Sequence, residues 1–121
     1  MRLDHIALAV RDPRASLSFY RDIVEIDGPV REEEYGFVIE TGDVSFTLFR
    51  GTRPSSAGDF HIGASLPDAD AVRRRRGELL ARGVVELEWV DEPGYVSTKV
   101  ADPDDYTVEL SWDEKRTDGR P

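Results

Sequence analysis

Residues 4–24 read DHIALAVRDPRASLSFYRDIV, and this stretch contains the pattern from which the fold can be worked out. Its first part, within residues 3–10, alternates along the chain as a β-strand with two different faces does. The two faces consist of Ile6, Leu8 and Val10 and of His5, Ala7 and Ala9. Asp12 followed by Pro13 predicts an N-cap and the first residue of a helix over 13–25.

The same pattern returns in residues 60–72, FHIGASLPDADAV. His61 opens a second alternating strand, over 60–66, and Asp68 stands before a second helix as Asp12 stands before the first. This second helix is predicted to run to about Arg82, with Gly83 ending it. Because element order, spacing and strand parity all agree, the sequence predicts an internal repeat.

Each half is predicted to end in a β-hairpin, since alternating residues flank short turn sequences. The expected elements are strands 36–41 and 44–50 in the first half, a strand at 84–90 and a turn at 91–94, and strands 95–101 and 106–112 in the second half. Residues 27–35 are expected to form a loop. The predicted fold class is α+β: two tandem βαβββ modules form a curved mixed sheet around a cleft, with the helices outside.

The predicted domain organisation is a single domain over 1–113 followed by a polar tail. It comprises module one at 1–50, a linker at 51–59, module two at 60–113 and the tail at 114–121. The linker is the one stretch whose Gly, Pro and Ser content marks it by composition.

The composition excludes several classes of protein. The chain has 121 residues, 39% of them apolar, and it has no cysteine, which rules out disulfides and thiolate metal sites. It shows no signal peptide and no membrane-spanning run, so we expect a cytoplasmic protein. A net charge of -9 disfavours nucleic-acid binding. On a helix, the arginines at 73–76 would ring the axis and so would form no single basic stripe.

Strand parity also predicts a cleft. On the face opposite the large apolar residues, the first strand of each half carries small side chains, such as Ala7, Gly63 and Ser65. Thr47 occupies the corresponding face of the last strand in the first half. Small residues leave space instead of filling a core, so we expect this face to enclose a binding site.

Both histidines of the chain and one glutamate are predicted to point into this cleft. Two neutral imidazoles and a carboxylate, here His5, His61 and Glu109, form a facial triad with open positions for water and substrate. Such a set suits Fe(II), Mn(II), Zn(II), Ni(II) or Co(II), which could polarise a carbonyl, activate water or, as Fe(II), activate O₂. Taken singly, each residue also has a structural reading, as a hydrogen-bonded histidine or a solvent-facing strand glutamate.

Three segments resemble the vicinal oxygen chelate superfamily, which includes glyoxalase I, fosfomycin resistance proteins, extradiol dioxygenases and bleomycin resistance proteins. They are residues 4–24, residues 60–72 and DPDDYTVELSW at 102–112. The resemblance implies His5, His61 and Glu109 as metal ligands. The family's fourth position falls on Thr47, where glyoxalase I members carry a glutamate. The three-ligand members, among them fosfomycin resistance proteins and extradiol dioxygenases, are therefore the better match.

The resemblance also directs attention to residues around the triad. Ala7 stands where fosfomycin resistance proteins carry a threonine, which argues against that activity. Extradiol dioxygenases use a further histidine that this chain lacks, so acid–base work would fall on Tyr95, Tyr106 or a water. Tyr95 is the candidate catalytic residue, with packing as the competing reading. Thr47 and Ser65 are expected to position substrate, with Ala7 lining the same site.

Two further features are interpreted as structural. Phe19 and Tyr20 match the family's aromatic pair on the first helix and are expected in the core. Asp105 stands where the family's DPDG turn has glycine, so either the turn needs no positive φ or aspartate tolerates one.

Two functions compete for this pattern. The first is a metal-dependent enzyme of lyase, isomerase or dioxygenase type, acting on a small oxygenated substrate that chelates the ion. The alternative is a metal-free binding protein of the bleomycin-resistance type that sequesters a cationic ligand, which the acidic charge favours. Family members of this length imply a homodimer, in which the two modules pair within one chain or exchange with a second chain.

Overall fold

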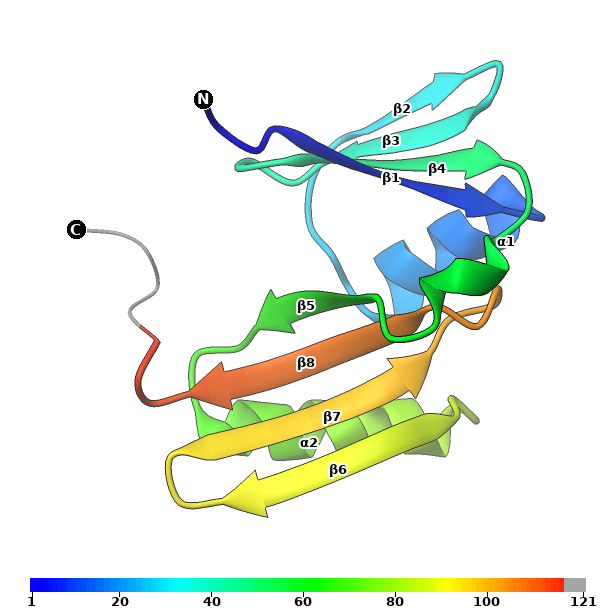
Figure 1. Cartoon of the computed structure of the whole chain (residues 1–121). Helices are drawn as coiled ribbons and strands as arrows, with labels where there is room; N and C mark the ends of the chain where they lie inside the picture. Colours follow the sequence, from blue (N-terminus) through cyan, green and yellow to red (C-terminus); the bar gives the residue numbers. More distant parts are fainter. Residues whose placement is uncertain (117–121) are drawn as a thin grey trace. The chain divides into compact units, whose positions relative to one another are not determined.

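The computed structural model describes residues 1–116 and divides the chain into two compact units (Figure 1). Unit 1 spans Met1–Gly58 and unit 2 begins at Asp59. Each unit contains one four-stranded mixed sheet with its helix on one face, so the α+β class and the repeated module are confirmed. The boundary between the units falls inside the predicted linker.

Unit 1 is built from a parallel pair of strands extended by two antiparallel strands. Its sheet has the order β1-β4-β3-β2, in which β1 lies parallel to β4. The elements are β1 (His5–Val10), α1 (Pro13–Ser18), a π-helical turn η1 (Phe19–Ile23), β2 (Val30–Glu33), β3 (Gly36–Glu40) and β4 (Ser45–Arg50).

The predicted cap and core of unit 1 are both confirmed. A side-chain oxygen of Asp12 accepts hydrogen bonds from the backbone N–H groups of Arg14 and Ala15, over 3.1 and 3.2 Å. Tyr20 is fully buried, and its ring packs edge-to-face against Phe46 with centroids 4.8 Å apart. Such aromatic contacts join the helical segment to the sheet and bury a large apolar area.

Two expectations for unit 1 were wrong. The helix predicted over 13–25 changes at Phe19 to a π-helical turn, in which the N–H of Val24 bonds to the carbonyl of Phe19. This wider turn accompanies two successive buried aromatics, Phe19 and Tyr20. The loop expected over 27–35 contains β2, an exposed edge strand that lacks the apolar alternation by which the other strands were recognised.

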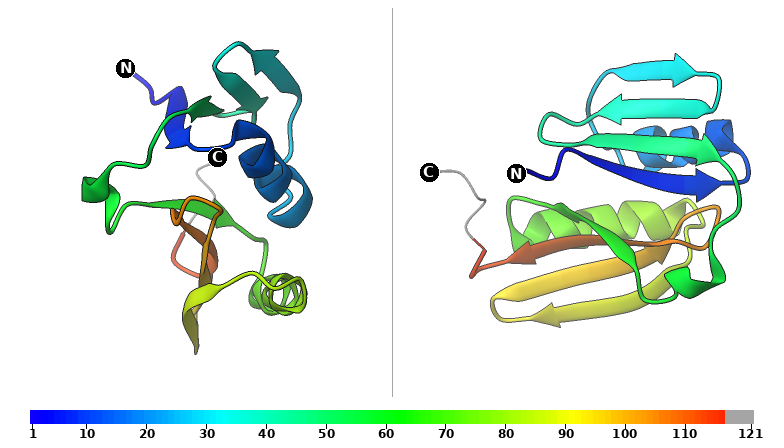
Figure 2. Two further views of the ribbon diagram at one scale, coloured as in Figure 1. Left: turned by 90° about the vertical axis from the view of Figure 1, so that its right-hand side faces the viewer. Right: turned by 45° about the horizontal axis from the view of Figure 1, so that its top comes forward.

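Unit 2 has the same plan, with its sheet in the order β5-β8-β7-β6 (Figure 2). Strand β5 lies parallel to β8, and the other pairs are antiparallel. The elements are β5 (His61–Ser65), α2 (Ala69–Ala81), β6 (Glu86–Glu92), β7 (Tyr95–Ala101) and β8 (Thr107–Asp113). The linker contains one short 3₁₀ helix, η2 (Ser55–Ala57).

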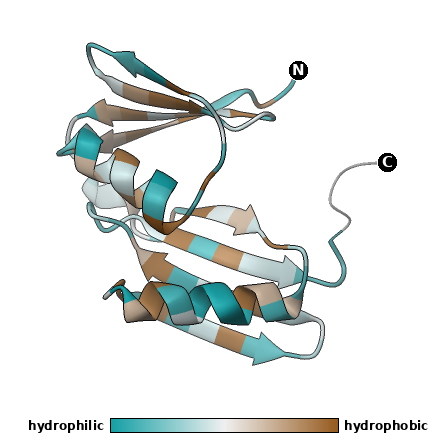
Figure 3. Ribbon diagram, turned by 180° about the vertical axis from the view of Figure 1, so that it is seen from behind, coloured by the Kyte–Doolittle hydropathy of each residue, from teal (hydrophilic) through white to brown (hydrophobic). Residues whose placement is uncertain are grey.

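Helix α2 is fixed to its sheet by an apolar stripe and by ion pairs from Arg73 to Asp91 and from Arg76 to Glu86. Hydrophilic and hydrophobic residues alternate along it (Figure 3), and the buried ones are Ala71, Val72 and Leu79. The Arg76 guanidinium donates to both carboxylate oxygens of Glu86, over 2.6 and 2.9 Å, and lies 4.3 Å from the centroid of the Trp89 ring. A bidentate pair of this kind has a defined geometry, so it fixes the position of the helix as well as adding to its stability.

The turns of unit 2 refine the predicted boundaries. Strand β6 begins and ends about two residues later than expected, so only Pro93 and Gly94 remain in the turn, and a bulge between Glu86 and Glu88 shifts its register. Gly94 has a φ of 84°, as the second central residue of a type II turn requires. Asp105 has a φ of 67°, so the DPDDY turn does need a positive φ, and aspartate adopts it.

The remaining expectations concern the end of the chain and the membrane. The part of the predicted tail over 114–116 is exposed, and residues 117–121 lie outside the described residues. Within residues 1–116, no helix combines the length and apolarity that crossing a membrane requires.

Candidate metal centre

The parallel pair β5–β8 places His61 and Glu109 on one face of the sheet of unit 2. Glu109 lies between Gly63 of β5 and Lys99 of β7 in the strand register. Alternation along β5 puts His61 and Gly63 on the same face. A Cβ added to Gly63 would meet nothing within 4 Å, so the space beside Glu109 is open, as the small residues predicted.

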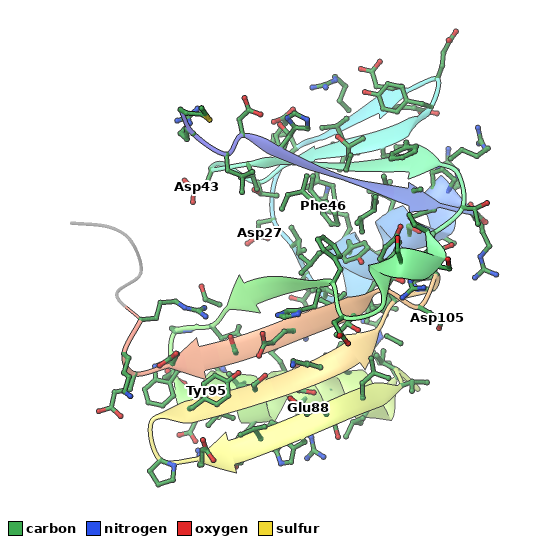
Figure 4. All side chains as sticks on the ribbon, viewed as in Figure 1. Asp27, Asp43, Phe46, Glu88, Tyr95 and Asp105 are labelled. Carbon is green, nitrogen blue, oxygen red and sulfur yellow. The ribbon has the colours of Figure 1, made fainter. Side chains whose placement is uncertain are left out.

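Glu109 is held by hydroxyl groups at one oxygen and faces a histidine at the other. The Tyr95 hydroxyl donates to Oε2 of Glu109 over 2.7 Å, and the Ser97 hydroxyl donates to the same oxygen. Oε1 lies 3.4 Å from Nε2 of His61. The Glu109 side chain is only 12% exposed, whereas that of His61 is 42% exposed. Figure 4 shows Tyr95 at the start of β7.

These surroundings keep Glu109 ionised. Burial alone would raise the pKa of Glu109, but the hydrogen bonds from Ser97 and Tyr95, with the charges of Lys99 and His61, outweigh it and lower the pKa. The hydrogen bond to Glu109 raises the pKa of Tyr95. At neutral pH the pair is therefore a carboxylate and a protonated phenol.

The contacts of His61 determine which ring nitrogen is available. Its Nδ1 lies 3.4 Å from the backbone carbonyl of Asp59, and a carbonyl can only accept, so this contact is favourable when Nδ1 carries the proton. In a neutral ring, Nε2 then presents a lone pair to Oε1 of Glu109. Two acceptors facing each other at this distance can share a cation, either a proton on Nε2 or a metal ion.

The distance between these two atoms matches that between neighbouring ligands of one metal ion. Ligand atoms at about 2.1 Å from a metal are about 3.0 Å apart at an angle of 90° and about 3.4 Å apart at the tetrahedral angle. Nε2 of His61 and Oε1 of Glu109 are 3.4 Å apart. A histidine nitrogen and a carboxylate oxygen are also chemically suited to the predicted ions.

Unit 1 brings its own predicted site residues together on the face of β1 and β4. The register pairs Ala7 with Thr47 and His5 with Ser45, and a hollow of about 460 Å³ is lined by several polar residues that include His5 and Thr47. Nδ1 of His5 lies 2.6 Å from a carboxylate oxygen of Asp4, which favours a proton on Nδ1 and leaves Nε2 available. Both histidines therefore have Nδ1 at an acceptor.

The predicted site residues thus fall into two groups by unit. His61, Glu109 and Tyr95 meet in unit 2, where Ser65 lies exposed on the same face of β5, while His5, Ala7 and Thr47 share a face in unit 1. Within either unit, over residues 1–116, no three His, Asp or Glu side chains are close enough to hold a metal.

Two residues on the Glu109 face of the sheet of unit 2, Ser97 and Lys99, were not recognised from the sequence. The hairpin turn at 102–105 could have revealed them, because it pairs Ala101 with Thr107 and so places Lys99 opposite Glu109 and Ser97 diagonally across from it.

A comparison with known families identifies the class of protein. A family described as Glyoxalase/Bleomycin resistance protein/Dioxygenase superfamily matches residues 2–110. Because the match covers most of the chain, this chain belongs to that superfamily, and the resemblance to vicinal oxygen chelate proteins is confirmed. A search of curated proteins gave no match.

Solved structures with the same fold include a lyase, an antibiotic resistance protein and an antibiotic binding protein. Lactoylglutathione lyase from Agrobacterium tumefaciens is 20% identical, with a TM-score of 0.72 over 90% of this chain and 91% of that one. The fosfomycin resistance protein FosX from Mesorhizobium loti is 19% identical, with a TM-score of 0.74 over 91% and 90%. The antibiotic binding protein TnmS3 from Streptomyces sp. CB03234 is 19% identical, with a TM-score of 0.66 over 91% and 93%. At these identities the likeness shows the fold alone.

Proposed function

We propose that the protein is a divalent-metal-dependent enzyme acting on a small oxygenated substrate, of lyase, isomerase or dioxygenase type. The observation that carries this proposal is the facing pair of His61 Nε2 and Glu109 Oε1, whose separation suits two ligands of one ion. Superfamily membership supports it, since the superfamily includes lyases and dioxygenases.

In this proposal three residues hold the ion. His61 and Glu109 of unit 2 supply two ligands, and His5 of unit 1 supplies the third, from the same chain or from a second copy. The bound ion would act as a Lewis acid toward the substrate's oxygens. Each histidine binds through Nε2, because Nδ1 lies at an acceptor in both.

The other site residues handle the substrate. Tyr95 keeps its proton at neutral pH, because the hydrogen bond that it donates to Glu109 raises its pKa, so it does not act as a base toward the substrate. Ser65 and Thr47 supply hydroxyls for orienting the substrate, and Ala7 leaves room for it. Thr47 cannot act as a carboxylate base, which disfavours a glyoxalase I reaction.

Metal analysis of the purified full-length protein tests the proposal. The protein, prepared without a histidine tag or chelator, should contain close to one equivalent of Fe, Mn, Zn, Ni or Co by mass spectrometry. Glu109→Gln and His61→Ala should lose this metal. Glu88→Gln is the matched control, because it makes the same change at an exposed position of the same sheet (Figure 4). Absence of metal from the wild type, and no uptake on titration, would rule the proposal out.

A metal-free binding function is the second candidate. The net charge of -9 favours a cationic ligand, and TnmS3, which shares the fold, is an antibiotic binding protein. Calorimetric titration with the cationic drug bleomycin separates the two functions. Binding of bleomycin by protein that takes up no metal would support the second candidate, whereas metal uptake without bleomycin binding supports the first.

A homodimer fits either candidate function, and we propose one. In their sheets, β1 and β5 are edge strands, and an edge strand has a row of backbone groups that can pair with a further strand. Light scattering coupled to size-exclusion chromatography should give twice the chain mass of 13.6 kDa. A single peak at the chain mass would contradict the dimer.

A further inference from the structure

The two carboxylate oxygens of Glu109 lie in different surroundings. Oε2 accepts hydrogen bonds from both Tyr95 and Ser97, whereas Oε1 faces Nε2 of His61. A carboxylate that is free to rotate about its last bond can exchange its oxygens or bind a metal through both. Two donors on the same oxygen oppose that rotation.

The positions of both donors are set by the fold. Ser97 and Tyr95 lie two residues apart on β7, on the same face as Glu109, and the β7–β8 ladder fixes their register. Ser97 is only 1% exposed, so water cannot readily replace its hydrogen bond to Glu109. The Tyr95 hydroxyl reaches the same oxygen from the start of the strand.

We infer that Ser97 and Tyr95 are positioning residues that hold Glu109 as a single-oxygen metal ligand through Oε1. This inference rests on the proposed metal site and adds a function for two residues outside the ligand set. Because Oε2 is held away from the ion, one coordination position is kept free for an oxygen of the substrate. Partners behind the ligands commonly contribute roughly 10–100-fold to metal affinity.

Cobalt(II) titration of the full-length protein tests this role. Co(II) reports affinity and, through the intensity of its visible absorption, the coordination number. Ser97→Ala and Tyr95→Phe remove one donor each, and Ser97→Thr keeps the hydroxyl. Ser56→Ala and Tyr35→Phe make the same changes at exposed positions in the linker and in the β2–β3 turn, and serve as controls.

We expect Ser97→Ala and Tyr95→Phe each to weaken Co(II) affinity by roughly 10-fold or more. Ser97→Thr should retain most of the affinity, and both controls should match the wild type. In a double variant that combines Ser97→Ala and Tyr95→Phe, the visible absorption of Co(II) should weaken, because the freed Glu109 carboxylate binds through both oxygens and raises the coordination number. Tyr95→Phe preserves the ring at a half-buried position, so it tests the role even if a Ser97 variant does not fold.

The possible failures differ from one another. If the wild type binds Co(II) but the variants keep its affinity and spectrum, the positioning role is wrong and the metal site stands. If the wild type binds no Co(II), the proposed function fails and the positioning role fails with it. Equal losses of affinity in the controls would show that the hydroxyls at 95 and 97 have no special part.

Discussion

Unit 2 holds two largely buried glutamates on opposite faces of one sheet, and their surroundings differ in kind. Glu86, on the face covered by α2, is held by both nitrogens of the Arg76 fork and by the Thr98 hydroxyl. Glu109, on the other face, accepts hydrogen bonds from the uncharged hydroxyls of Tyr95 and Ser97. Glu86 is therefore in contact with the full positive charge of Arg76, whereas Glu109 faces the titratable imidazole of His61.

This difference separates a structural carboxylate from a candidate ligand. The pKa of Glu86 is lowered mainly by its hydrogen bond from Arg76, and its negative charge is already compensated there. Glu109 is kept ionised mainly by hydroxyl donors, which add no positive charge. It therefore retains a negative charge for a cation, beside a histidine nitrogen.

The largest expected effect is on the stabilisation that a metal gives. A metal at 100 times its dissociation constant should raise the free energy of unfolding of the wild type by about 2.7 kcal/mol. Glu109→Gln should abolish that increase, because losing a ligand should cost more affinity than the roughly 10–100-fold lost with an outer partner. Glu86→Gln should show the same increase on addition of metal, although its free energy of unfolding without metal should be lower than that of the wild type. Urea unfolding with and without Zn(II) measures the increase in each variant. Equal increases in Glu109→Gln and Glu86→Gln would show that the two glutamates do not differ in metal binding.

The next effect is on the stability of the metal-free protein. Arg76→Met keeps much of the packing on Trp89 but removes the charged hydrogen bonds to Glu86, so we expect a loss of about 1–3 kcal/mol. Arg74→Met, at an exposed position of the same helix, is the matched control. Denaturant unfolding measures both variants. Equal stability of Arg76→Met and the control would show that the ion pair is dispensable.

A smaller effect is expected in the dependence of stability on pH. The pKa of Glu109 is lower in the folded protein than its ordinary value of 4.5, so its ionisation favours folding above that pH. This contribution should disappear as pH falls through the folded pKa. The stability gap between the wild type and Glu109→Gln, measured by urea unfolding of metal-free protein, should narrow below about pH 4.5. A gap that stays constant down to pH 3 would contradict the lowered pKa.

The smallest effect is expected at an exposed carboxylate, Asp4. Asp4 and His5 are both 68% exposed, so Asp4→Asn should leave the thermal midpoint unchanged. Because Asp4 favours the proton on Nδ1 of His5, the same change should weaken Co(II) affinity only a few-fold, less than the roughly 10–100-fold seen for well-formed outer partners. An affinity loss as large as that of Glu109→Gln would make Asp4 a ligand itself.

Much of the fold could be predicted because its signals are local. Strand alternation, the caps at Asp12 and Asp68, and the turn residues before each final strand identified most elements. Strand β2 was missed because its residues are exposed, so burial left no pattern in them. Backbone pairing with β3 and the ion pair of Arg31 with Glu40 hold it in place.

The candidate site was predicted less completely than the fold. Parity placed His61 and Glu109 on one face, but it does not report which side chains reach each other across strands. Ser97 was missed because a serine within a strand carries no signal of its own. Whether Ser97 reaches Glu109 depends on the register of β7 with β8, which the turn after β7 sets.

The turn at 102–106 also bears on the order in which unit 2 folds. Asp102 accepts hydrogen bonds from the N–H groups of Asp104 and Tyr106, closing a short loop between β7 and β8. Hairpins of this kind form within microseconds, whereas the parallel strand β5 joins only after its long crossover has closed. We therefore expect the carboxylate and its two donors to assemble before the histidine arrives. Higher φ-values for Val100→Ala than for Ile62→Ala would bear this out, and the reverse order would contradict it.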